Sequence, residues 1–182
     1  MKNPDENTAG FTRDADTAAH SRTTTGTRTI TAAAGPGRGS AQAGSTAGTG
    51  RTATHAVRSE EDLLTVRHAV RNAALRVGFG IVDQTRVVTA ASELARNAYI
   101  HGGGGTLTLE QLEQPGHRGL RMTTSDDGPG IPDVAAALTD GYTTGAGLGH
   151  GLGGVRRLMD EFEIHSVPGK GTTIRATRWT SR

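Results

Sequence analysis

The stretch Asp126-Asp127-Gly128-Pro129-Gly130 follows a predicted strand, Leu120 to Ser125. Its glycines let the backbone turn sharply and approach a ligand closely. A carboxylate at a strand end, such as that of Asp126, can accept a hydrogen bond from an exocyclic amine. Taken alone, the stretch is better explained as an ordinary Asp-Gly turn. Its meaning therefore depends on the sequence on either side.

Downstream lies a glycine-rich run, residues 145–154 (GAGLGHGLGG), which leads into a helix predicted over 151–161. A glycine-rich loop that feeds a helix N-terminus forms an anion cradle, because its N–H groups converge on phosphate oxygens. It is not a Walker A loop, since no Gly-Lys-Ser/Thr follows. It is not a Rossmann turn, since no strand directly precedes it. The alternative is a flexible linker.

Upstream, a helix is predicted from the N-cap Asp83 to about Ile100, where residues 102–105 (GGGG) end it. Glu93 and Asn97 are four residues apart on this helix and project from one face. A carboxylate beside an amide oxygen suits a Mg²⁺ site, with the carboxylate available as a base through water. A pair of this kind is also common on a solvated helix face.

The remaining pattern predicts the other elements. A first helix begins at the N-cap Ser59, has an acidic first turn, and ends at Gly78. Further strands are predicted over 106–112, 162–166 and 172–179, with a short helical segment over 132–138. This order predicts an α+β fold, a two-layer sandwich with a mixed, mostly antiparallel sheet and helices on one face.

The first 56 of the 182 residues have a different composition. They are rich in Thr, Ala, Gly and Ser, and their large apolar residues are Met1, Phe11 and Ile30. Such a segment buries too little apolar surface to offset its ordering entropy. We therefore expect a disordered arm over 1–56 and a folded domain over 57–182. A basic arm that docks a partner and a misplaced start codon near Val57 are the alternatives.

Charge and composition exclude several classes. The net charge of +2 divides into +3 for residues 1–58 and −1 for the rest, so the folded part has no basic surplus for nucleic acid. The absence of cysteine excludes disulfides, thiolate metal sites and a cysteine nucleophile. No apolar run reaches the length of a membrane span, which favours a soluble, cytoplasmic protein with no membrane or nucleic-acid partner.

The order of the three clusters resembles the GHKL ATPase and kinase superfamily (Bergerat fold). The resemblance is closest to the RsbT-type serine/threonine kinases, the switch kinases of the bacterial stressosome, and it covers about residues 57–182. The matching segments are 83–98, 128–133, 140–144, 147–152, 157–162 and 171–174.

By this resemblance the chain binds ATP and Mg²⁺. Glu93 would be the general base that acts on the acceptor hydroxyl, and Asn97 would hold Mg²⁺. Asp126 would bind the adenine amine. The remaining nucleotide contacts would come from Gly128 and Gly130 on the pocket floor, from Gly147, Leu148, Gly149, Gly151 and Leu152 around the phosphates, and from Thr172 on the adenine side. Residues 132–146 would form a lid.

The same resemblance implies the partners. The substrate would be a serine or threonine on a STAS-domain antagonist or scaffold, and the released kinase would activate a PP2C-type phosphatase. An alternative is an anti-sigma factor that sequesters a sigma subunit in a nucleotide-dependent way. A sensor histidine kinase fragment is disfavoured, since no upstream helical hairpin carries an acceptor histidine. His101 and His150 lack a second ligand at a suitable spacing, so no histidine metal site is predicted.

Overall fold

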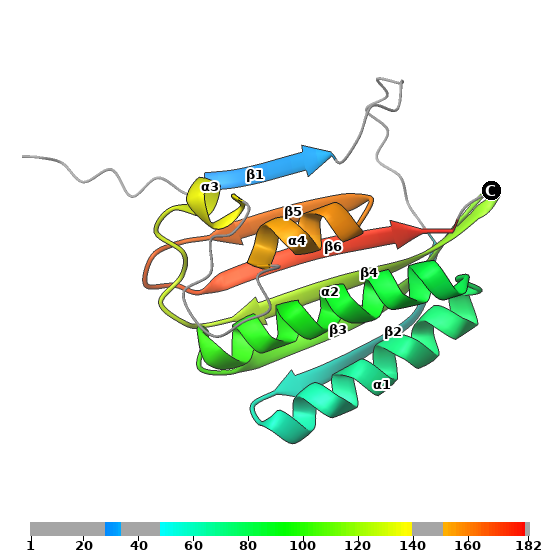
Figure 1. Ribbon diagram of the computed structural model, residues 1–182, viewed down its shortest axis with the longest axis horizontal. Helices are drawn as coiled ribbons and strands as arrows, with labels where there is room; N and C mark the ends of the chain where they lie inside the picture. Colours follow the sequence, from blue (N-terminus) through cyan, green and yellow to red (C-terminus); the bar gives the residue numbers. More distant parts are fainter. Residues whose placement is uncertain (1–27, 34–47, 140–150, 181–182) are drawn as a thin grey trace, which may run out of the picture.

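The computed structural model describes residues 28–33, 48–139 and 151–180, and in them six strands form one sheet (Figure 1). The strand order is β1-β5-β6-β4-β3-β2, and every neighbouring pair is antiparallel. The strands are β1 (Arg28–Ala33), β2 (Gly48–Val57), β3 (Gly105–Gln114), β4 (His117–Asp126), β5 (Glu161–Ser166) and β6 (Thr172–Trp179). The sheet is thus the mostly antiparallel one expected, without a parallel pair in the described part. Strand β6 lies between β4 and β5 and runs antiparallel to both.

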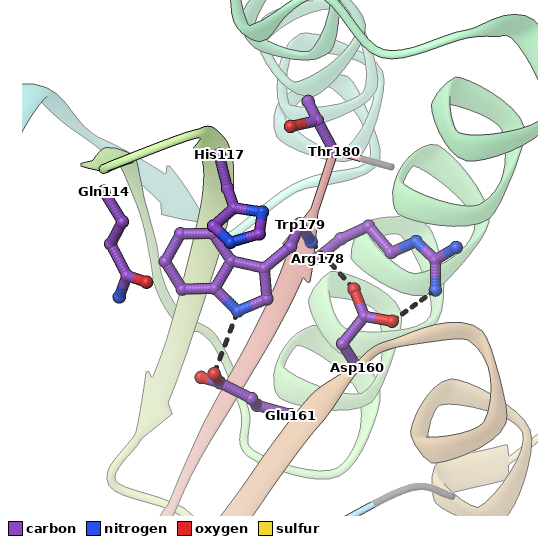
Figure 2. A pocket seen from close by; sticks show the side chains of 7 residues that line it. All are labelled: Gln114, His117, Asp160, Glu161, Arg178, Trp179 and Thr180. Atoms are coloured by element: carbon purple, nitrogen blue, oxygen red, sulfur yellow. Dashed lines mark hydrogen bonds and ion pairs between the residues drawn. The ribbon is translucent and has the colours of Figure 1, made fainter. Parts of the chain in front are cut away.

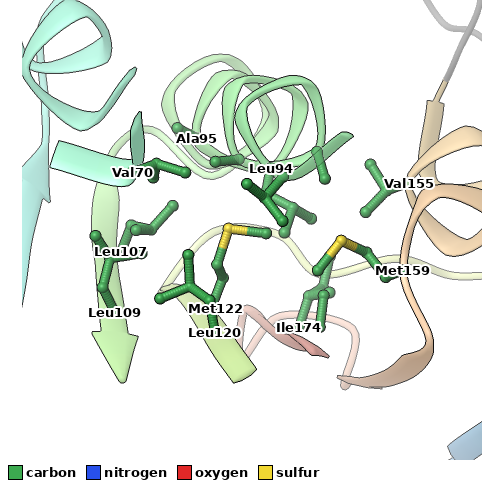
Figure 3. Close-up of a cluster of buried hydrophobic side chains, with 14 of the residues drawn as sticks. Val70, Leu94, Ala95, Leu107, Leu109, Leu120, Met122, Val155, Met159 and Ile174 are labelled. Atoms are coloured by element: carbon green, nitrogen blue, oxygen red, sulfur yellow. The ribbon is translucent and has the colours of Figure 1, made fainter. Parts of the chain in front are cut away.

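The helices lie on one face of this sheet, as expected (Figure 1). They are α1 (Glu60–Val77), α2 (Ile81–Ile100), α3 (Val134–Ala137) and α4 (Gly151–Leu158). Apolar side chains fill the space between the layers: Leu94 of α2 and Val155 of α4 meet Leu107, Met122 and Ile174 of the strands (Figure 3). All five are at most 5% exposed. The fold is therefore the predicted two-layer α+β sandwich, with its core between the helices and the inner face of the sheet.

The start and the end of α1 follow the sequence signals. The Asp62 N–H donates to the Ser59 hydroxyl at 3.2 Å, and the Ser59 N–H donates to the Asp62 carboxylate at 3.1 Å. This reciprocal pair is a capping box. At the other end Gly78 has φ +89°, the left-handed conformation that ends helices. Both predicted boundaries are confirmed.

The predicted start of α2 is wrong by a few residues. The helix begins at Ile81 with Gly80 as its N-cap, because the Gln84 N–H donates to the Gly80 carbonyl at 2.9 Å. Asp83 lies in the first turn, where a carboxylate is favoured by the helix dipole. Its carboxylate accepts hydrogen bonds from Arg86 and Arg178 instead of capping the helix.

Strand β2 corrects the predicted arm over 1–56. Residues 48–57 pair with β3 along its length, and the Thr54 and Thr108 hydroxyls lie 2.9 Å apart across the pair. The side chains of residues 50–54 are exposed and Val57 is buried. An edge strand of this kind depends on backbone hydrogen bonds more than on apolar burial, so composition does not reveal it. A second strand within the predicted arm, β1, pairs with β5; residues 1–27 and 34–47 lie outside the described residues.

The two faces of the sheet differ. Side chains alternate between faces along a strand, so Leu120, Met122, Thr124 and Asp126 of β4 share the helix-covered inner face. Arg121, Thr123 and Ser125 share the outer face, where Ser125 and Thr173 place their hydroxyls 3.0 Å apart. Across the described residues, no helix combines the length and hydropathy that crossing a membrane requires.

Candidate active site

The inner face of the sheet changes from apolar to polar at the end where β4 finishes and β6 begins. Thr124 and Asp126 continue the row of Leu120 and Met122, and Asp126 pairs with Thr172 of β6. The buried polar side chains of the described residues are Thr124, Ser166, Thr172 and Thr177. Three of these four gather here, since Ser166 and Thr172 also share a register position and place their hydroxyls 2.9 Å apart. Polar groups concentrated at one end of an apolar layer point to a ligand site.

Asp126 is the charged member of this cluster. Its Oδ1 accepts a hydrogen bond from the Gly128 N–H at 3.0 Å, and the Thr172 backbone contributes a second one. Burial raises the pKa of Asp126 above its ordinary value of 3.8. The two backbone hydrogen bonds lower that pKa and the neighbouring Asp127 raises it, and the net shift is upward. A partly desolvated carboxylate with fixed orientation is well suited to accept a hydrogen bond from a ligand amine.

Close backbone packing holds Asp126 in place. A Cβ atom on Gly102 would lie 2.5 Å from the Asp126 Cβ and 2.6 Å from the Ala98 carbonyl oxygen. Gly171, with φ +89°, lies directly against the Asp126 carbonyl. Real Cβ atoms do not occupy such positions, so both sites require glycine. Because these two residues lack side chains, the segments after α2 and before β6 can pack closely against the end of β4.

The loop after β4 is hydrogen-bonded to the end of β5 and to the β5–β6 turn. The Ile131 N–H donates to the Ser166 hydroxyl at 2.8 Å, and the Gly169 N–H donates to the Pro129 carbonyl at 2.8 Å. Gly130 has φ +71° and packs against the Val167 carbonyl. The DDGPG stretch is therefore a rigid loop, with Gly128 packed against Gly102 at its base.

Helix α2 brings the predicted Glu93 and Asn97 to the same end of the molecule. Both side chains are partly exposed, and Arg96 between them is exposed. The Asn97 carbonyl accepts hydrogen bonds from the His101 N–H at 2.9 Å and the Gly102 N–H at 3.3 Å. Gly102 packs against Asp126 and donates a hydrogen bond to the Asn97 carbonyl, so it links the end of α2 to the Asp126 carboxylate. Glu93 lies about one helical turn before Asn97 on α2.

The predicted phosphate loop is described only in part. Gly147, Leu148 and Gly149 lie outside the described residues, as does His150. Gly151 and Leu152 are the first two residues of α4, which lies beside α2 (Figure 1). Leu152 is 7% exposed and belongs to the core. The predicted lid over 132–146 is described up to residue 139 and contains α3, whose N-cap Asp133 accepts a hydrogen bond from the Ala136 N–H at 3.0 Å.

The described residues offer the amide oxygen of Asn97 as a candidate ligand for Mg²⁺. No group of three or more His, Cys, Asp or Glu side chains within residues 28–33, 48–139 and 151–180 is arranged to hold a metal ion. Mg²⁺ commonly binds through one or two protein oxygens, substrate phosphates and water, and the Asn97 amide oxygen could be one of those protein ligands.

The polar end of the sheet also contains a hydroxyl that the described residues leave without a partner. The Thr124 Oγ1 atom is buried and makes no hydrogen bond within the part of the chain that the structure describes.

A pocket of about 450 Å³ lies at the opposite end of the sheet, where the β3–β4 turn and the end of β6 meet (Figure 2). It is lined by Gln114, His117, Asp160, Glu161, Arg178, Trp179 and Thr180. Its polar groups bond to one another: Arg178 Nη1 donates to Asp160 at 2.7 Å, and the Trp179 indole donates to Glu161 at 2.9 Å. We assign this pocket a structural role, because its charges are already paired within the protein.

Comparison with known proteins agrees with this geometry. Residues 57–178 match the family of the histidine kinase-like ATPase domain. The chain is 49% identical over 123 residues to the serine/threonine-protein kinase RsbT of Bacillus subtilis, covering 68% of this chain and 92% of that protein. It is 34% identical over 101 residues to the anti-sigma F factor of a Thermoanaerobacter species, covering 51% of this chain and 68% of that protein.

A solved structure supports the same fold. The RsbU and RsbW domains of Rv1364c from Mycobacterium tuberculosis superpose with a TM-score of 0.51 at 20% identity. The match covers 71% of this chain and 32% of that one, so this chain spans about a third of that protein's length. The solved structure supports the fold alone, whereas the sequence matches also show the family. The chain belongs to the histidine kinase-like ATPase domain family and, within it, to the RsbT-type serine/threonine-protein kinases.

Proposed function

We propose that this kinase transfers the γ-phosphate of Mg-ATP to a serine or threonine of a STAS-domain antagonist or scaffold. Once released from that partner, it binds and activates a PP2C-type phosphatase in a partner-switching pathway. The observation that carries the nucleotide half of this proposal is the partly buried Asp126 carboxylate, held by two backbone N–H groups at the polar end of an apolar layer.

In this proposal Asp126 accepts the hydrogen bond of the adenine amine, and Thr172 closes the same side of the base. Gly128 and Gly130 form the floor. The N–H groups of residues 147–152 receive the phosphates, where the N-terminus of α4 favours negative charge. Asn97 would hold Mg²⁺ at the phosphates, where the ion would supply positive charge.

The chemical step requires little from the protein beyond positioning and charge. The substrate hydroxyl oxygen forms a bond to the γ-phosphorus while the bond to the bridging oxygen of ADP breaks. The hydroxyl proton passes to the Glu93 carboxylate. Glu93 suits this role because it is partly exposed on α2, one turn from Asn97, where a protein substrate can approach it.

The second candidate is a sigma-binding protein that uses nucleotide to set its affinity. Its support is the 33–35% identity to anti-sigma F factors of several bacteria. The 49% identity to RsbT, over a larger share of both chains, favours the switch kinase.

The test is transfer of labelled γ-phosphate from Mg-ATP to a STAS-domain protein from the same genome. Wild type is compared with Glu93→Ala and Asn97→Ala, and Arg96→Ala serves as a matched exposed control on the same helix. We expect transfer to serine or threonine that both site variants abolish while their thermal midpoints stay near wild type. Tight ATP binding without transfer, together with co-purification of a sigma subunit, would support the second candidate.

A further inference from the structure

The polar cluster at the end of the inner face contains one hydroxyl that the protein leaves unused. Ser166 accepts from the Ile131 N–H, donates to the Gly171 carbonyl at 3.2 Å, and contacts the Thr172 hydroxyl. Asp126 accepts two backbone hydrogen bonds. Thr124 is 3% exposed, and its Oγ1 has no hydrogen-bond partner. Leaving a buried hydroxyl unpaired destabilises a fold, so such groups are rare without a reason.

The position of Thr124 supplies the reason. It lies two residues before Asp126 on β4, so both side chains project from the same inner face. Its register partners are Ile174 on β6 and Leu107 on β3, both apolar and at most 5% exposed. Thr124 therefore lies between the apolar Met122 and the Asp126 carboxylate on the inner face of β4, with apolar partners on both neighbouring strands. A flat heteroaromatic ring that binds Asp126 through its amine would place its remaining edge against this row.

We propose that Thr124 is a base-recognition residue, whose hydroxyl hydrogen-bonds the adenine edge directly or through one buried water. This inference rests on the proposed nucleotide site and adds a specificity contact to it. In the free protein the Thr124 hydroxyl has no hydrogen-bond partner among the described residues, and it pairs when the base is bound. Binding of the base then gives the Thr124 hydroxyl a hydrogen-bond partner, and this new hydrogen bond increases the affinity for the nucleotide.

The experiment measures ATP and ADP affinity and the nucleotide-free thermal midpoint of wild type, Thr124→Val, Thr124→Ser, Asp126→Asn and the matched control Thr123→Val. Valine keeps the shape and removes the hydroxyl. Thr123 is the adjacent residue on the outer face, so its substitution removes a hydroxyl of the same strand away from the site.

We expect Thr124→Val to weaken ATP and ADP equally, by about five- to thirtyfold, because the base is common to both. Its nucleotide-free midpoint should equal or exceed that of wild type, since no existing hydrogen bond is lost. Thr124→Ser should retain affinity near wild type, and Thr123→Val should change neither quantity.

Two results separate the failure of this inference from failure of the proposed site. If Thr124→Val binds ATP like wild type while Asp126→Asn binds it weakly, the nucleotide site stands and Thr124 is not part of it. If Thr124→Val lowers the nucleotide-free midpoint and leaves affinity unchanged, its hydroxyl is structural and the inference is also overturned. Equal binding by wild type and Asp126→Asn would instead overturn the nucleotide site itself.

Discussion

Asp126 combines two properties that oppose each other in a single residue. Its carboxylate is partly desolvated, which costs folding free energy when the group is ionised, and it is oriented by backbone N–H groups for a ligand. Functional sites commonly hold groups that are suboptimal for stability. The residue should therefore respond in opposite directions when stability and binding are measured separately.

We expect Asp126→Asn to weaken ATP binding by about tenfold or more and GTP binding much less, because the carboxylate pairs with an amine that guanine lacks at that position. The folded-state pKa of Asp126 is raised, so its contribution to stability is lost as pH rises from 3.8 through the raised pKa. The nucleotide-free variant should thus be at least as stable as wild type at pH 7, with a flatter stability profile in mildly acidic buffer. Calorimetric titration and thermal melts between pH 4 and pH 7 test both points; equal losses for ATP and GTP would contradict the adenine contact.

The glycines around Asp126 give a prediction of the opposite kind. Gly102→Ala places a methyl group within 2.6 Å of Ala98 and Asp126 atoms, so we expect a loss of about 1–3 kcal/mol of unfolding free energy. Gly80→Ala is the control, since a Cβ there meets nothing within 4 Å. Chemical denaturation of the two variants measures the difference, and equal stability would show that the strand end can move.

At this scale the sequence predicts part of the site. The strand-end position of Asp126 follows from the alternation of β4 and the turn after it, and its pairing with Thr172 follows from the β5–β6 hairpin. The sequence does not single out Thr124, because threonine is common in strands. The available indication is its position two residues before Asp126, which places both side chains on the same face of β4. Gly102 is visible only as a helix terminator, because its contact with Asp126 joins segments 24 residues apart.

At the scale of elements, Arg178 links three segments. Its guanidinium donates to Asp83 of α2 at 2.8 Å and to Asp160, just before β5, at 2.7 Å. Arg178 and Asp83 side chains are each 15% exposed. Asp160 also accepts from the Trp179 N–H at 2.8 Å. This network fixes the start of α2 against the end of β6.

Arg178→Met should lower the unfolding free energy by about 2–3 kcal/mol, because it leaves two carboxylates without their shared cation. The exposed pair Arg175–Glu163 is the control: Arg175→Met should cost less than about 1 kcal/mol, since both side chains are about half exposed. ATP affinity should be unchanged in both variants, as the network lies at the end of the sheet away from Asp126. Denaturant titration and nucleotide binding on the same samples decide this, and a stable Arg178→Met protein would rule out the structural role.

The elements themselves follow the sequence where apolar periodicity is strong. Helix α1, the β5–β6 hairpin and the C-terminal half of α2 agree with prediction. The prediction of Asp83 as the N-cap of α2 is wrong, because aspartate is favoured both at the N-cap and in the first turn of a helix. Its tertiary contact with Arg178, which the sequence does not reveal, distinguishes the two positions. Strand β2 is missed because its side chains are small, polar and exposed.

On the scale of the whole molecule, the sheet extends beyond the region that matches the family. The matched region begins at residue 57, while β2 begins at Gly48 and covers the edge of β3. In the described residues the paired sheet therefore begins upstream of residue 57. A protein that begins at residue 58 exposes the backbone of a ten-residue strand.

We expect a chain starting at residue 48 to melt about 10 °C or more above one starting at residue 58, because the shorter chain lacks every β2–β3 hydrogen bond. Both chains lack β1, so the comparison isolates β2. Melting curves and light scattering give the result; equal midpoints would mean that β2 contributes nothing and that the composition-based boundary holds.

The packing of Gly102 and Gly171 against Asp126, and of Gly128 against Gly102, has a consequence for genetics. Loss-of-function alleles should accumulate at these three codons even in a screen that selects only for protein abundance, because any side chain there displaces backbone. Asp126 and Thr124 should behave in the opposite way, tolerating Asn and Val in an abundance screen and failing only when signalling is scored. Comparing the two screens codon by codon would separate the scaffold of the site from its chemistry without purifying the protein.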